Sequence, residues 1–96
     1  MSETPSAFSL HQNYPNPFNP STAIQFDLPE AAQVRIRVFD LLGREVSELV
    51  HASLDAGTHV VYWNAAVSSG SYLCRMESTT AEGQVVRSSR RMLLVR

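Results

Sequence analysis

The chain has 96 residues, of which 44% are hydrophobic and 18% charged, and this is the size of one domain that can bury its own core. Nine acidic and eight basic residues give a formal net charge of -1, which excludes a strongly basic nucleic-acid-binding domain. A single cysteine excludes an intrachain disulfide bond, and no apolar run approaches the roughly 18 residues of a membrane-spanning helix, so we expect no membrane insertion.

The N-terminal part divides into a polar segment and a proline-rich loop. Residues 1–7 are small and polar, which indicates a linker or an expression remnant before the domain proper, residues 8–96. Residues 11–22 alternate asparagine with three prolines, and this composition is typical of an ordered, irregular loop. We expect Tyr14 and Phe18 to anchor this loop in apolar sockets and asparagine side chains to bind its backbone.

Short segments of alternating apolar and polar residues follow the loop and are separated by turns. The residues at 45–50 also fit a short helix, because Val46, Leu49 and Val50 have helical spacing. The final segment is either one strand or a pair of strands. Six or seven short strands without a long helix predict an all-β sandwich. The segments are residues 23–28, 34–39, 45–50, 59–63, 72–77 and 84–95.

Two glycines are expected to have structural roles in the turns between these segments. Gly43 ends a turn that begins at Asp40, and Gly57 ends a turn that begins at Asp55. Aspartate at the first turn position and glycine at the last are typical of β-turns, because glycine accepts a positive φ at no steric cost.

No pattern in the sequence predicts catalysis, a metal site or a cofactor. The three histidines are not spaced with other ligands for a metal, and Cys74 lies on the apolar side of its segment, as a buried structural thiol does. Trp63 is expected in the core. The alternative is that Trp63 and the tyrosines form a sugar-stacking platform, as in a carbohydrate-binding module of a secreted enzyme.

Charge is distributed unevenly along the chain. Residues 84–96 contain four arginines and no acid, while residues 1–83 contain four arginines and nine acids, so the two parts carry +4 and -5. Arginines on a final strand either form a solvated edge that prevents aggregation or contact a partner.

Several motifs in order resemble the type A C-terminal sorting domains of the type IX (Por) secretion system. Residues 10–22, LHQNYPNPFNPST, resemble the family's opening signature, and residues 34–46 resemble its hairpin, which ends in D-x-x-G-R-x-V. The A-G-x-H motif at residues 56–59 with Trp63, the S-G-x-Y motif at residues 69–72, and the basic-then-aliphatic end at residues 90–96 follow. The resemblance implies an immunoglobulin-like sandwich of about seven antiparallel strands, similar to the flagellar hook-capping protein domain.

The resemblance also implies a function. Such a domain directs an N-terminally fused cargo protein, often a hydrolase, through the periplasm and the outer-membrane translocon to the cell surface or the medium. A sortase-like peptidase then separates the two, and the polar residues before Phe8 are the expected region of cleavage. The chain would therefore be a substrate and not an enzyme, with the translocon and sortase components as its partners.

The terminal strand and a nearby turn are the candidate recognition surface. If the last strand lies at a sheet edge, its backbone could pair with a receptor by strand addition, and its arginines would provide charge complementarity. A purely structural sandwich that acts by self-assembly is the remaining alternative. The candidate recognition residues are Gly70, Ser71, Tyr72, Arg90, Arg91, Leu93, Leu94, Val95 and Arg96.

Overall fold

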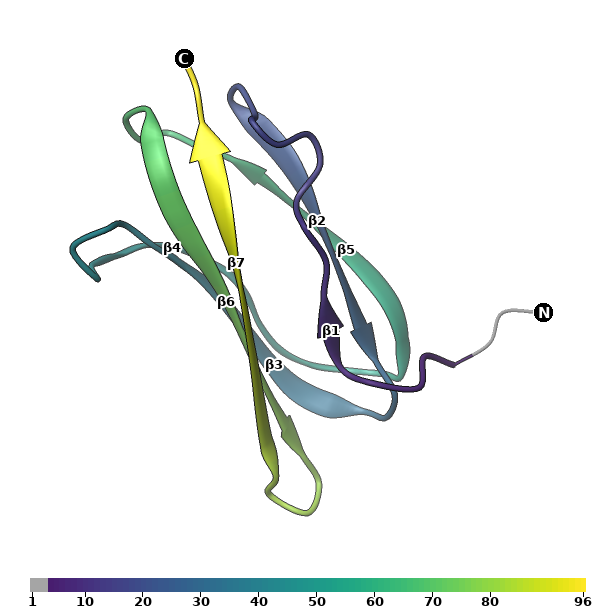
Figure 1. Ribbon diagram of the computed structural model, residues 1–96. Coiled ribbons are helices and arrows are strands. Elements are labelled where there is room, and N and C mark those ends of the chain that lie inside the picture. Colours follow the sequence, from purple (N-terminus) through teal and green to yellow (C-terminus); the bar gives the residue numbers. More distant parts are fainter. Residues whose placement is uncertain (1–3) are drawn as a thin grey trace.

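The computed structural model describes residues 4–96, which contain seven β-strands and no helix (Figure 1). The predicted linker at residues 1–7 lies partly outside the described residues, and no strand occurs in residues 4–7. The strands are β1 (Ser9–Leu10), β2 (Ser21–Leu28), β3 (Ala32–Phe39), β4 (Glu45–Leu54), β5 (Gly57–Asn64), β6 (Gly70–Thr80) and β7 (Val85–Leu94).

The strands form two antiparallel sheets that enclose a common core, as the predicted sandwich requires (Figure 1). One sheet has the order β1-β2-β5 and the other has the order β4-β3-β6-β7. Alternate side chains of β2, β3 and β6 point inward, because successive side chains of a strand lie on opposite faces. The most deeply buried apolar side chains among these are Ile24, Phe26, Leu28, Val34, Ile36, Val38, Cys74 and Met76.

The structure settles two alternatives and adds one strand. Residues 45–54 form strand β4, so the alternative of a short helix is wrong. The final segment is one strand, β7, and not a pair. Strand β1 was not predicted, and its two residues pair with Asp27 and Phe26 of β2.

Both predicted turn glycines adopt conformations that other residues rarely reach. Gly43 has φ +83° and Gly57 has φ +138°. The Gly43 amide donates to the Asp40 carbonyl at 3.0 Å, and Asp40 Oδ1 accepts from the Leu42 and Arg44 amides. This turn fixes the β3–β4 connection at one end of the four-stranded sheet.

Candidate recognition surface

The end of β7 is bound along its outer edge by the proline-rich loop. The Phe18 amide donates to the Leu93 carbonyl and the Val95 amide donates to the Phe18 carbonyl, each at 3.0 Å. Asn16 Oδ1 accepts from the Leu93 amide at 3.0 Å, and Gln12 Nε2 donates to the Arg91 carbonyl at 2.7 Å. Segments from opposite ends of the chain therefore form one unit, which Figure 1 shows beside the C-terminus.

This pairing corrects the expectation that the end of the chain offers free backbone groups to a receptor. β7 is indeed an edge strand, since it pairs only with β6 in its sheet. However, the outward backbone groups of Leu93 and the carbonyl of Arg91 already have partners in the loop. Strand addition at residues 91–95 would first require the loop to leave.

The loop is held by one buried aromatic residue and a buried polar network. Phe18 is 2% exposed and packs against Trp63, with ring centroids 5.6 Å apart, which confirms its predicted socket. Buried Asn13 donates to the Pro15 carbonyl and to Thr22 Oγ1, each at 3.0 Å, so asparagine does bind the loop backbone. Tyr14 is 82% exposed, and the socket predicted for it is wrong.

The candidate recognition residues divide into buried and exposed groups. Tyr72 and Leu94 are buried, and the Tyr72 ring meets the Trp63 ring edge-on at 5.8 Å, so these two side chains support the core. Gly70 and Ser71 pair with Leu94 and Leu93 as the first residues of β6. Leu93 and Val95 have exposed side chains at this end of the sheet.

The four C-terminal arginines have different surroundings. Arg87 Nε donates to Glu77 at 2.9 Å, Arg90 Nε donates to the Leu10 carbonyl at 2.8 Å, and an Arg96 Nη donates to the Ala65 carbonyl at 2.6 Å. Arg90 thus links β7 to β1 of the other sheet. Among residues 4–96, no carboxylate lies within ion-pair distance of Arg91, which is exposed.

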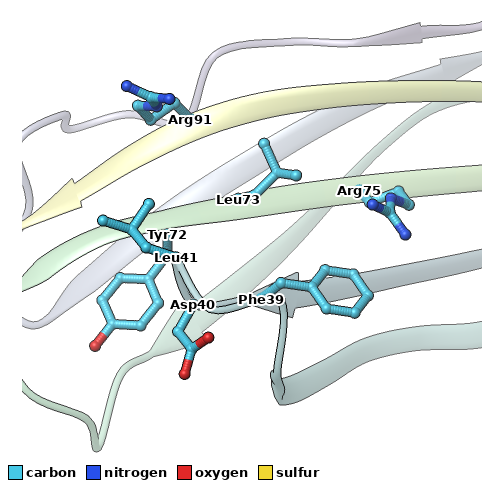
Figure 2. A pocket seen from close by; sticks show the side chains of 8 residues that line it. Phe39, Asp40, Leu41, Tyr72, Leu73, Arg75 and Arg91 are labelled. Atoms are coloured by element: carbon cyan, nitrogen blue, oxygen red, sulfur yellow. The ribbon is translucent and has the colours of Figure 1, made fainter.

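A groove that the sequence did not reveal lies on the outer face of the four-stranded sheet, beside Arg91 (Figure 2). Phe39, Leu73 and Arg91 form a row across β3, β6 and β7, because Phe39 pairs with Leu73 and Leu73 with Arg91. Arg75 and Leu41 complete its wall, and Asp40 lies at one end. The space has a volume of about 280 Å³. We call this the outer-face groove.

Glu77 connects two arginines on the same face and has a lowered pKa. The hydrogen bond from Arg87 is the largest cause, a second from Arg37 adds to it, and burial of the carboxylate opposes both. A pKa below the ordinary value of 4.5 means that the ionised form stabilises the fold.

This pKa predicts acid destabilisation with a definite sign. The contribution of Glu77 is fully present above pH 4.5, the ordinary value, and is lost as the pH falls through the lowered pKa of the folded state. We expect the denaturation midpoint of Glu77→Gln to fall less steeply below about pH 4.5 than that of the wild type. Urea titrations at several pH values measure this, and equal slopes for the two proteins would contradict the assignment.

The cysteine and the aromatic residues considered as possible sites differ in their exposure. Burial raises the pKa of the Cys74 thiol to about 12, so it is inert as a nucleophile at neutral pH. Within residues 4–96, no three histidine, cysteine or acidic side chains gather to hold a metal. Trp63 is 5% exposed and Tyr72 is also buried, so neither ring has a face free for stacking on a sugar, whereas Tyr14 and Tyr62 are exposed.

Comparison with known proteins identifies a family from one match and a fold from another. The family model described as the secretion system C-terminal sorting domain matches residues 12–88. A solved structure of CopC from Methylosinus trichosporium OB3b has a TM-score of 0.60 and 14% sequence identity, covering 92% of this chain and 93% of that chain. This likeness concerns the fold alone. No curated protein matches the sequence.

Proposed function

Because the chain belongs to the family of secretion system C-terminal sorting domains, we propose that it carries an N-terminally attached cargo across the outer membrane through the type IX secretion system. The matched residues cover most of the sandwich, from the proline-rich loop into β7, and this match is the observation that carries the proposal. Domains of this family are in general non-catalytic, so the role assigned to the chain is recognition.

We place the recognition surface at the end of the sandwich where β7 meets the proline-rich loop. Arg91, Leu93 and Val95 are exposed there, and hydrogen bonds to the proline-rich loop hold their backbone in place. A surface that is ordered before binding loses less conformational entropy when a partner docks. Residues 89–96 lie outside the matched range, so their role is supported by this geometry and by their charge.

Separation from the cargo is a second step of the proposal. Residues 4 and 6–7 are exposed and precede β1, so a peptidase could reach the backbone there without unfolding the sandwich. The domain would travel through the periplasm with its cargo, and a sortase-like peptidase would leave the cargo in the medium or at the cell surface. Mass spectrometry of an exported cargo should find its new C-terminus before Phe8, whereas an intact fusion outside the cell would contradict cleavage.

A point substitution tests the proposed surface without disturbing the core. We expect Arg91→Glu to reduce export of a reporter fused to residues 8–96 by about tenfold or more, because it reverses a charge that faces the partner. The melting temperature should change little, since Arg91 is exposed and makes no ion pair among the described residues.

Arg87→Glu is the matched control for this substitution. It changes the same charge on the same strand and face, four residues away, where Arg87 contacts Glu77. The proposed recognition surface at the end of β7 would be contradicted if Arg91→Glu left export unchanged. It would also be contradicted if both substitutions reduced export equally.

A further inference from the structure

The outer-face groove combines exposed apolar side chains in a way that favours a covering partner. Phe39 and Leu73 are only half-buried although they lie on β3 and β6, the two central strands of the sheet. Leu41 is 72% exposed on the groove wall, and Leu93, two residues after Arg91 and on the same face, is 39% exposed. Exposed apolar side chains that gather beside a groove are typical of contact sites between proteins.

The charges of the groove are not balanced by the chain itself. On the same sheet, Arg35 pairs with Glu48, while Arg37 and Arg87 pair with Glu77. Arg75 and Arg91 have no carboxylate within ion-pair distance among residues 4–96. Their arrangement therefore favours an acidic partner.

Arg75 is held in position for such a partner. Its guanidinium carbon lies 4.7 Å from the centroid of the Phe39 ring, so the charged group stacks on the floor of the groove. Cation–π stacking fixes the plane of a guanidinium while leaving its N–H groups free to donate to a carboxylate. Asp40, the acid at the end of the groove, is already bound by the side chain and amide of Arg44.

The size and composition of the groove indicate what kind of partner it takes. Its volume of about 280 Å³ is at or below the range of roughly 300–1,000 Å³ of small-molecule sites, so it suits one or two side chains. We propose that the outer-face groove binds a protein segment in which acidic residues flank an apolar side chain. The carboxylates would contact Arg75 and Arg91, and the apolar side chain would cover Phe39 and Leu73.

This inference rests on the proposed sorting role and extends it. It assigns the partner's chemistry and adds Phe39, Leu73 and Arg75, which belong to strands far from the end of the chain in sequence. Recognition would then involve β3, β6 and β7 together, so only the folded sheet could present the complete surface.

A titration followed by NMR amide and arginine signals tests the groove directly. The probe is a short synthetic peptide in which aspartate and glutamate alternate with leucine, and its control has lysine in place of the acids. We expect the acidic peptide alone to shift the signals of Phe39, Leu73 and Arg75. The double variant Arg75→Gln/Arg91→Gln should weaken binding about tenfold or more.

The matched control is Arg35→Gln/Arg87→Gln, which removes the same charge from the same sheet and should leave affinity within about twofold. Absence of binding, shifts on the other sheet, or equal losses in both double variants would overturn the proposal. If the domain bound vesicles of anionic phospholipid in preference to the acidic peptide, the groove would be a lipid-binding surface. That result would also overturn the proposal of a protein partner.

Export in cells separates this inference from the proposed function. We expect Arg75→Gln to reduce export of the reporter fusion severalfold and Arg35→Gln to leave it unchanged. If the wild type and the Arg75→Gln variant are both fully exported, the proposed role of the groove is wrong, and the sorting role is unaffected. If the wild type is not exported, the sorting role is contradicted. The peptide titration would then still test whether the groove binds an acidic segment.

Discussion

Replacement of Phe18 by alanine is expected to lower the melting temperature by at least about 12 °C. Truncation of a buried phenylalanine costs about 3–5 kcal/mol, and each kcal/mol shifts the melting temperature of a domain of this size by about 4–8 °C. Phe18 is 2% exposed and contacts Trp63. Its loss would also loosen the loop that binds Leu93 and Val95.

Tyr14→Ala provides the control within the same loop. Tyr14 is 82% exposed, so its truncation should change stability by no more than about 0.5 kcal/mol. Thermal melts followed by circular dichroism compare the two variants. An unchanged melt for Phe18→Ala, or an equal loss for both, would show that the loop does not close the end of the sandwich.

Removal of residues 92–96 is expected to unfold the domain. Met92 and Leu94 are each 1% exposed in the core, and loss of such side chains costs about 2–5 kcal/mol apiece. The sum approaches the whole stability of a typical domain, about 5–15 kcal/mol. The truncated chain should lose the dispersed amide spectrum and the cooperative melt of the wild type.

This expectation determines how export experiments must be read. A truncated fusion that fails to leave the cell would not distinguish a lost signal from a lost fold. Arg91→Glu does, because it alters the surface and leaves Met92 and Leu94 in the core. A truncated chain with a native-like spectrum would contradict the structural role assigned to the end of β7.

The alternation of apolar and polar residues predicted most strands but left a helix open as the alternative for β4, and the reason is local. Between Ile36 and Phe39 the pairing of β3 with β4 shifts twice, so Val46 and Leu49 are extra residues without a partner on β3. Such bulges interrupt strict alternation. The resulting spacing of Val46, Leu49 and Val50 imitates a helix, although the segment is a strand.

The recognition surface could be predicted only in part, because its geometry depends on contacts between distant segments. The charge of residues 84–96 drew attention to Arg91, but the order of the strands brings Phe39 and Leu73 beside it. The proline-rich loop has no period, so nothing in the sequence distinguished buried Phe18 from exposed Tyr14. The resemblance to sorting domains, by contrast, was readable from motifs and is confirmed by the match over residues 12–88.

Export of a fluorescent reporter fused to residues 8–96 tests whether the domain is a sorting signal. The reporter carries an inner-membrane export signal and is expressed in a host with the type IX system and in a strain of that host without the translocon. We expect reporter in the medium or at the cell surface only when the translocon is present. Retention in the periplasm of both strains, or equal release from both, would contradict a sorting function.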